Sequence, residues 1–230
     1  LYGNSRAPTG ERVMLRFLAS DLAAGVGDTA LAWRQASEAQ RLGFSSTIDA
    51  EARARLLALR IREFDALSDV EAAVARDSAR ARGTLLLKRL KDNLSIVRLF
   101  LAGPNRDGAG VFLAAEVVRD SLGAFSLAHA MFRSIERDIP ESRLNGRALL
   151  ASRMMIPEST AVYDARILEK WPQSSAAAKL TGGDPAESTV RIEDTYLKQS
   201  WQFVMTQWGD TLKARKTADS LAALAGPRRQ

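Results

Sequence analysis

Apolar residues recur at spacings of three and four between Val111 and Ser142, and this pattern predicts a pair of helices. The apolar positions of the first helix are Phe112, Ala115, Val118 and Leu122, and those of the second are Phe125, Ala128, Phe132 and Ile135. These spacings put each set on one helix face. Gly123 can end the first helix in a left-handed conformation, and Pro140 cannot continue the second. A pair of this kind cannot bury its apolar face alone, so it predicts similar neighbours.

The same periodicity predicts helices along the rest of the chain. Their approximate ranges are 11–24, 29–42, 47–64, 69–83, 85–101, 143–153, 158–171 and 188–224. The segment 25–28 reads as a helix stop followed by a cap, and 103–108 is the plainest loop in the chain. Pro-x-Ser occurs at 140–142, 157–159 and 172–174. In this phrase proline stops one helix and serine can cap the next.

The central pair resembles a tetratricopeptide repeat. Phe112 stands at the early aromatic position, Ala128 at the mid-repeat alanine, Phe132 at the aromatic four residues later and Pro140 at the closing proline. Glu116 and Arg119 depart from the small residue and the tyrosine of the family pattern. The closing Pro-x-Ser phrase is similar in style to bacterial envelope lipoproteins, both outer-membrane assembly factors and the periplasmic coordinator of the Tol–Pal system. The resemblance implies a stack of antiparallel helix hairpins.

We therefore predict an all-α, right-handed solenoid of tetratricopeptide type with a long C-terminal helix. Its parts would be an irregular arm (1–10), N-terminal helical hairpins (11–102), tetratricopeptide-like repeats (109–180) and the C-terminal helix (188–225).

The amino-acid composition agrees with a helical fold and excludes functions that depend on cysteine. Apolar residues make up 46% of the 230 residues and aromatic residues only 7%, which favours helices over strands. Because the sequence has no cysteine, it holds no disulfide, cysteine-based zinc site or thiol nucleophile. No apolar run approaches the roughly 18 residues of a membrane-spanning helix. The first residue, Leu1, is consistent with a processed or truncated product.

No catalytic constellation appears in the sequence. His129 is the single histidine, and no carboxylate lies three or four residues from it. The motifs of a nucleophile elbow, a P-loop and a helical zinc site are all missing. Glu136, Asp138 and Glu141 cluster at a helix end, where we interpret them as solvated charges. The sequence thus predicts a protein that is not an enzyme and that uses no cofactor or metal.

The net charge of +6 suits nucleic acid, anionic lipid or an acidic protein surface, although a solvated arginine-rich face is the common alternative. The positive charge is densest between Arg76 and Arg98. The candidate contacts there are Arg76, Arg80, Lys88 and Arg89. Nucleic-acid grooves combine such charge with stacking aromatics, and none occurs between Phe64 and Phe100.

Leu197, Trp201 and Trp208 recur at spacings of four and seven on the long C-terminal helix. Such a stripe normally packs into a core. If the helix projects from the stack, the stripe becomes a docking face for a partner protein or for a membrane interface.

We predict a non-catalytic scaffold or clamp, a membrane-extrinsic structural subunit of a larger membrane-associated complex. Its partners would be other subunits of that complex, in envelope assembly or in a bioenergetic or photosynthetic setting, with anionic lipid headgroups as a further contact. The location would be periplasmic and peripheral to the membrane, with the cytoplasm as the alternative. A basic helical nucleic-acid-binding or regulatory protein is the alternative function.

Overall fold

The computed structural model describes residues 8–43 and 45–224, and over these residues it contains eleven α-helices and no strand. The predicted all-α class is confirmed. The first seven residues of the predicted arm lie outside the described residues, as do residue 225 and the remainder of the tail.

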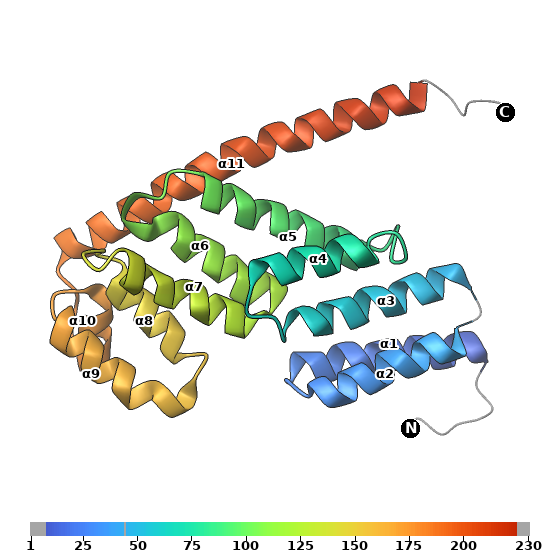
Figure 1. Cartoon of the computed structure of the whole chain (residues 1–230), viewed down its shortest axis with the longest axis horizontal. Coiled ribbons are helices and arrows are strands. Elements are labelled where there is room, and N and C mark those ends of the chain that lie inside the picture. Colours follow the sequence, from blue (N-terminus) through green and yellow to red (C-terminus); the bar gives the residue numbers. More distant parts are fainter. Residues whose placement is uncertain (1–7, 44, 225–230) are drawn as a thin grey trace. The chain divides into compact units, whose positions relative to one another are not determined.

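Most α-helices begin and end within a few residues of the predicted positions, but the fourth ends six residues early and the helix Ser175–Thr181 was not predicted. The α-helices are α1 (Thr9–Gly25), α2 (Thr29–Leu42), α3 (Ser46–Ile61), α4 (Leu67–Asp77), α5 (Leu85–Ala102), α6 (Ala109–Val117), α7 (Phe125–Asp138), α8 (Asn145–Arg153), α9 (Thr160–Lys170), α10 (Ser175–Thr181) and α11 (Glu187–Leu224) (Figure 1). Three short helical turns, η1 (Arg106–Gly108), η2 (Val118–Leu122) and η3 (Pro157–Ser159), lie between them.

The chain divides into two compact units that share three helices. Unit 1 comprises residues 1–95 and 116–130, and unit 2 comprises residues 96–115 and 131–230. The divisions therefore fall within α5, at the end of α6 and within α7, and not in the 103–108 loop.

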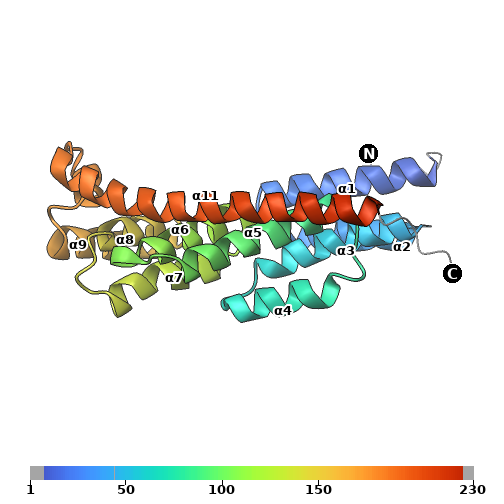
Figure 2. The ribbon, with the colours of Figure 1, turned by 90° about the horizontal axis from the view of Figure 1, so that it is seen from above.

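In unit 1, α1 packs on α2, α2 on α3, and α3 on α4 (Figures 1 and 2). Val13 and Phe17 of α1 meet Ala39 and Ala52 in one buried cluster. The alanines let the helix backbones approach closely, because they add little bulk at the contact. The predicted stop and cap between α1 and α2 is confirmed, since the Asp28 carboxylate accepts a hydrogen bond of 2.9 Å from the Leu31 amide.

Not all apolar residues of α1 are buried. Val13 and Phe17 are buried, whereas Leu15, Leu18 and Leu22 of the same helix are exposed. The fourth helix is shorter than its predicted range of 69–83, because α4 ends at Asp77. The Thr84 hydroxyl begins α5 by accepting from the Leu87 amide.

The central pair largely follows its predicted pattern. All four predicted positions of the first helix are buried, and Phe112 packs edge to face on Phe132 at a centroid distance of 5.2 Å. Gly123 has the predicted left-handed conformation, with φ of 67°. The last turn before it is π-helical, which the apolar spacing did not indicate. Phe125 is exposed, so its predicted place on the buried face is wrong.

The three Pro-x-Ser phrases differ in what their serines do. Ser174 caps α10 by accepting from the Ala177 amide at 3.1 Å. Ser159 precedes α9 but makes no capping hydrogen bond. Ser142 does not cap α8 either, because that helix begins three residues later. Its hydroxyl accepts from the Leu144 amide at 3.0 Å, before the helix begins, and donates to the Asp107 carbonyl at 2.7 Å. The expectation that Ser142 caps the next helix is therefore wrong.

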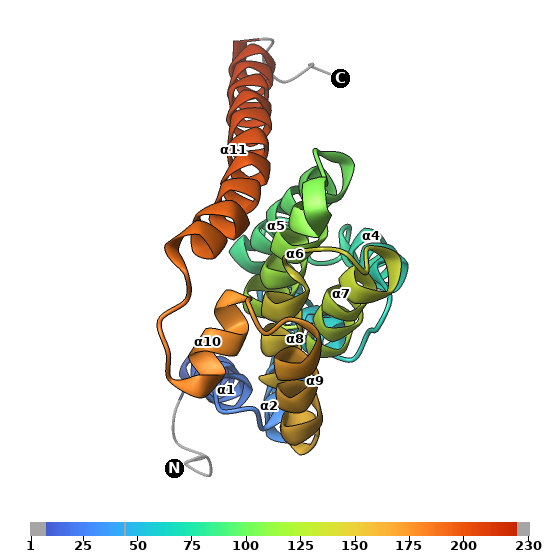
Figure 3. The ribbon, with the colours of Figure 1, turned by 90° about the vertical axis from the view of Figure 1, so that its left-hand side faces the viewer.

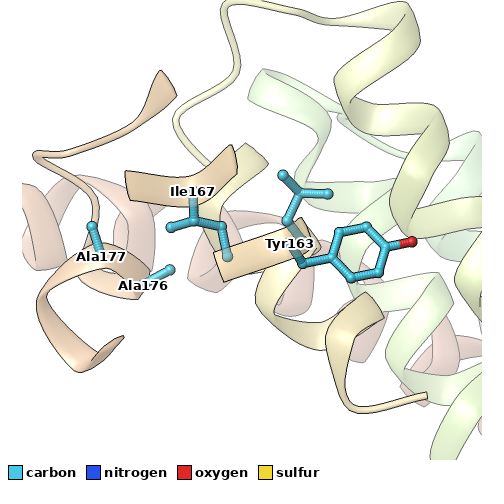
Figure 4. Close-up of a cluster of buried hydrophobic side chains, with 5 residues drawn as sticks. Tyr163, Ile167, Ala176 and Ala177 are labelled. Carbon is cyan, nitrogen blue, oxygen red and sulfur yellow. The ribbon is translucent and has the colours of Figure 1, made fainter. Parts of the chain in front are cut away.

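In unit 2, α8, α9 and α10 enclose a small apolar core, and α11 starts beside them and extends away (Figures 1 and 3). The core residues are Leu149, Tyr163, Ile167, Ala176 and Ala177 (Figure 4). Over the described residues, no helix has the length and apolar character needed to cross a membrane.

Candidate functional site

A buried carboxylate fixes the start of α11. Glu193 is only 1% exposed, and its carboxylate receives the Arg147 guanidinium from α8 at 2.6 Å. The Ser175 hydroxyl and amide of α10 donate to the same carboxylate at 2.5 and 3.3 Å. Arg147 also pairs with exposed Asp194 at 2.8 Å. A buried charge is tolerated when it is paired and hydrogen-bonded, and these contacts tie α11 to α8 and α10.

A second set of contacts holds α11 against the 103–108 loop. The Ser200 hydroxyl donates to the Pro104 carbonyl at 2.9 Å, and the Arg106 guanidinium lies 4.9 Å from the centre of the Tyr196 ring. At Gly103, an added Cβ would come within 2.6 Å of the Phe203 ring. The loop can therefore approach α11 this closely because position 103 has no side chain.

The predicted stripe on α11 is neither fully buried nor fully exposed. Leu197 and Trp208 are half-buried, whereas Trp201 is 47% exposed and its ring centre lies 5.8 Å from that of Phe100. Met205, one turn further on, is 49% exposed. One side of Trp201 thus rests on α5 while the other, together with Met205, forms an outward-facing apolar surface. The side chains of α11 beyond Thr211 lie outside the part of the chain whose burial is described.

The four predicted basic residues are all exposed. Arg76 lies in the last turn of α4, Arg80 in the following turn, and Lys88 and Arg89 near the start of α5. They belong to unit 1, whereas the α11 stripe belongs to unit 2. The two predicted sets are therefore carried by different compact units.

The residues that the structure describes contain no cluster of metal-binding side chains. They include no group of three or more histidine, cysteine, aspartate or glutamate side chains arranged to hold a metal ion. His129 is half-buried within α7.

The carboxylates at the end of α7 form a site that the sequence interpretation missed. Asp138 and Glu141 are exposed as expected, but the Glu136 side chain is only 10% exposed, so its interpretation as a solvated charge is wrong. It lies among Arg133 of its own helix and Arg166 and Lys170 of α9. The spacing of three between Arg133 and Glu136 was visible in the sequence. The two α9 cations lie about thirty residues away and left no local signal.

The exposed pair beside this cluster is simpler. Arg137 donates to Asp138 through Nε at 2.7 Å and Nη2 at 2.9 Å. These hydrogen bonds, together with the charge of Arg137, lower the pKa of Asp138 and raise the pKa of Arg137. Both side chains remain in water, so the pair contributes little to the fold.

Comparison of the chain with protein-family models, with curated proteins and with solved structures finds no match. The tetratricopeptide-like fold therefore stays a prediction, which rests on the sequence pattern of residues 112–140.

Proposed function

We propose that this protein is a non-catalytic scaffold that binds partner proteins through the aromatic stripe of α11. The observation that carries the proposal is the outward-facing surface of Trp201 and Met205 on a helix that is fixed at its start. Aromatic and methionine side chains are enriched at protein interfaces, and tryptophan is a frequent hot spot.

The way α11 is held supports a binding role. Glu193, Ser200 and Val204 are buried and share one side of the helix, so Trp201 cannot turn inward without breaking these contacts. A surface that is already ordered loses less conformational entropy when a partner binds. The stripe on α11 is therefore already ordered in the free protein, as a preorganised binding surface would be.

We further propose that the helices stack as tetratricopeptide-like antiparallel hairpins and that the protein is a periplasmic, membrane-extrinsic subunit of a larger complex. The repeat-like spacing of Phe112, Ala128, Phe132 and Pro140 supports the first part. The basic net charge and the apolar surface of α11 support the second.

The test is capture of partners from native membranes by wild type and by Trp201→Ala, with quantitative mass spectrometry. The matched control is Gln202→Ala, an exposed neighbour on the same helix. We expect stoichiometric recovery of a membrane complex with wild type and the control, and a loss of about tenfold or more with Trp201→Ala, as for a hot spot. Equal recovery by all three proteins would contradict the assignment of the stripe.

Exposed Arg76, Arg80, Lys88 and Arg89 favour a second candidate function, nucleic-acid binding. It is tested by titrating salt against binding to a DNA or RNA duplex. Replacing Lys88 by Gln should lower the salt slope by about one, whereas Lys179→Gln, an exposed lysine in unit 2, should leave it unchanged. Absence of binding at low ionic strength would remove this candidate.

A further inference from the structure

A basic cleft lies between α7 and α9 in unit 2, outside the stripe proposed for partner binding. Its volume is about 760 Å³. The residues that line it are Arg133, Glu136, Arg137, Pro140, Glu141, Arg166, Lys170 and Trp171. Clefts that bind small molecules commonly measure about 300–1,000 Å³, so this one is large enough for such a ligand.

The cations of the cleft outnumber its carboxylates. Arg133 Nη1 lies 3.0 Å from Glu136 Oε2, Arg166 Nε donates to Oε1 at 2.7 Å, and Lys170 Nζ lies 3.7 Å from Oε1. Four cations and two carboxylates line the cleft, and Arg137 is also paired with Asp138, so one positive charge is left over. Arg133, Arg166 and Lys170 converge on the single carboxylate of Glu136, so an anionic ligand would be attracted to these three cations.

The same cations remain within reach of a ligand. The side chains of Arg166 and Lys170 are 37% and 50% exposed, although both contact Glu136. Trp171 and Pro140 add apolar surface to the lining, and Lys170 Nζ lies 5.9 Å from the centre of the Trp171 ring. The cleft therefore combines convergent cations with an apolar wall.

We propose that this cleft binds a small phosphate monoester whose organic part carries a flat apolar group. A phosphate monoester has a charge of about −1.5 to −2 at pH 7 and three acceptor oxygens. Its oxygens would accept from the guanidinium of Arg166 and the ammonium of Lys170, while the apolar group would pack on Trp171. Arginine matches phosphate because its planar guanidinium can donate two parallel hydrogen bonds.

The test is isothermal titration calorimetry with phenyl phosphate at low salt, using the whole chain. We expect saturable binding of phenyl phosphate. Phenyl sulfate carries a single negative charge and should bind with an affinity about fivefold or more lower. Lys170→Gln and Arg166→Gln should each weaken phenyl phosphate binding by about fivefold or more, since each removes one charge-assisted hydrogen bond. Lys179→Gln, which removes an exposed lysine outside the cleft, should leave the affinity unchanged.

Glu136→Gln distinguishes a ligand site from an ion cluster that serves only the fold. In a ligand site, the carboxylate competes with the phosphate for the same cations, so its removal should tighten binding several-fold. Phenyl phosphate should then raise the melting temperature of this variant more than that of wild type. If the variant does not fold, Lys170→Gln and Arg166→Gln carry the test.

Several results would overturn the proposal. The first is the absence of saturable heat on titration with phenyl phosphate. The second is a loss of affinity with Lys179→Gln as large as with Lys170→Gln, because this would indicate general attraction to a basic protein. Lys170-dependent flotation with vesicles of phosphatidic acid in phosphatidylcholine, without binding of phenyl phosphate, would replace a small molecule by a lipid surface. The proposal does not depend on the scaffold function, because Trp201 lies outside the cleft and partner capture is measured separately.

Discussion

Phe125 and Phe132 lie two turns apart on α7 and differ completely in exposure. Phe132 is fully buried and contacts the edge of Phe112, whereas Phe125 is half exposed. The sequence spacing assigned both to one buried face. Phe125 is the first residue of the helix, where the buried face has just begun, and its burial depends on whether another element reaches that far.

Replacing Phe132 by Ala should therefore destabilise the protein by about 3–5 kcal/mol, because it removes a buried ring and leaves a cavity. Phe125→Ala is the matched control on the same helix, and its effect should be within about 0.5 kcal/mol, as for most surface substitutions. Urea unfolding followed by circular dichroism measures both free energies of unfolding. Similar values for the two variants would mean that Phe132 is not in the core.

Asp49 provides a test at acid pH. The Gln40 side-chain amide donates to its carboxylate at 2.8 Å and Arg53 donates at 2.6 Å, and these hydrogen bonds lower the pKa of Asp49. A carboxyl group whose pKa is lowered by folding adds stability at pH values above its unfolded pKa. That stability is lost as the pH falls through the folded pKa.

Asp49→Asn should thus be less stable than wild type at pH 7 by less than about 1 kcal/mol, since Asp49 is partly exposed. The difference should shrink as the pH falls below about 4, near the ordinary pKa of aspartate. Gln40→Ala should reduce the pH-dependent part by removing one donor. Urea unfolding between pH 2 and 7 checks both, and a difference that stays constant over this range would exclude the effect.

At the scale of elements, the ends of the helices follow local chemistry while their burial follows their neighbours. Asp28 and Ser174 cap helices through their own side chains, as their sequence positions predict, and Thr84 is a further cap. The buried side of α11 is set by contacts with residues as much as 96 positions away, such as the hydrogen bond from Ser200 to Pro104. The helix itself was predictable from the sequence, but the face it buries was not.

The polar contact at the start of α11 should be essential for the position of this helix. Glu193→Ala removes the buried carboxylate that pairs with Arg147 and leaves this guanidinium with the Ser175 hydroxyl and the exposed Asp194, so we expect a loss of about 3–5 kcal/mol, as for other broken buried pairs. Hydrogen exchange should show faster exchange in the first turns of α11. Asp194→Ala is the control and should cost less than about 1 kcal/mol, because that carboxylate is exposed. Equal costs would mean that burial of Glu193 is unimportant.

Gly123 ends the π-helical turn η2 in a conformation that other residues rarely adopt. Gly123→Ala should destabilise the protein by about 1–2 kcal/mol, the usual cost of a left-handed residue with a Cβ. Its added Cβ would also lie 3.4 Å from Arg62 Nε. Gly25→Ala, within α1 and with nothing within 4 Å, should stabilise by up to about 1 kcal/mol. Thermal unfolding of the two variants gives opposite shifts if both assignments are correct.

At the scale of the whole molecule, the two proposed kinds of partner, a protein complex and a nucleic acid, would bind through surfaces that differ in charge. The chain carries a net charge of +6, and the candidate contacts Arg76, Arg80, Lys88 and Arg89 belong to unit 1, whereas the apolar stripe belongs to unit 2. Binding through apolar side chains changes little with salt, while binding through cations to nucleic acid is strongly weakened by it.

We therefore expect recovery of the membrane complex to change less than about twofold between roughly 50 and 200 mM salt. A protein that makes six to ten phosphate contacts loses about 10³–10⁵ in affinity over the same range. Capture at a series of salt concentrations, with wild type and Trp201→Ala in parallel, measures the dependence. A steep loss for both proteins would favour the basic residues as the contact.

The amino-acid sequence by itself determined the helical class, the approximate helix ranges and several caps. Helix periodicity, glycine turns and proline stops act within a few residues, so they can be read locally. Only the tertiary structure decided which faces are covered. It exposed Leu18 and Phe125, left Trp201 half exposed, buried Glu193 and brought Arg166 and Lys170 to Glu136. The physical reason is that burial and ion pairing depend on residues far apart in the chain, and periodicity gives no information about which of them meet.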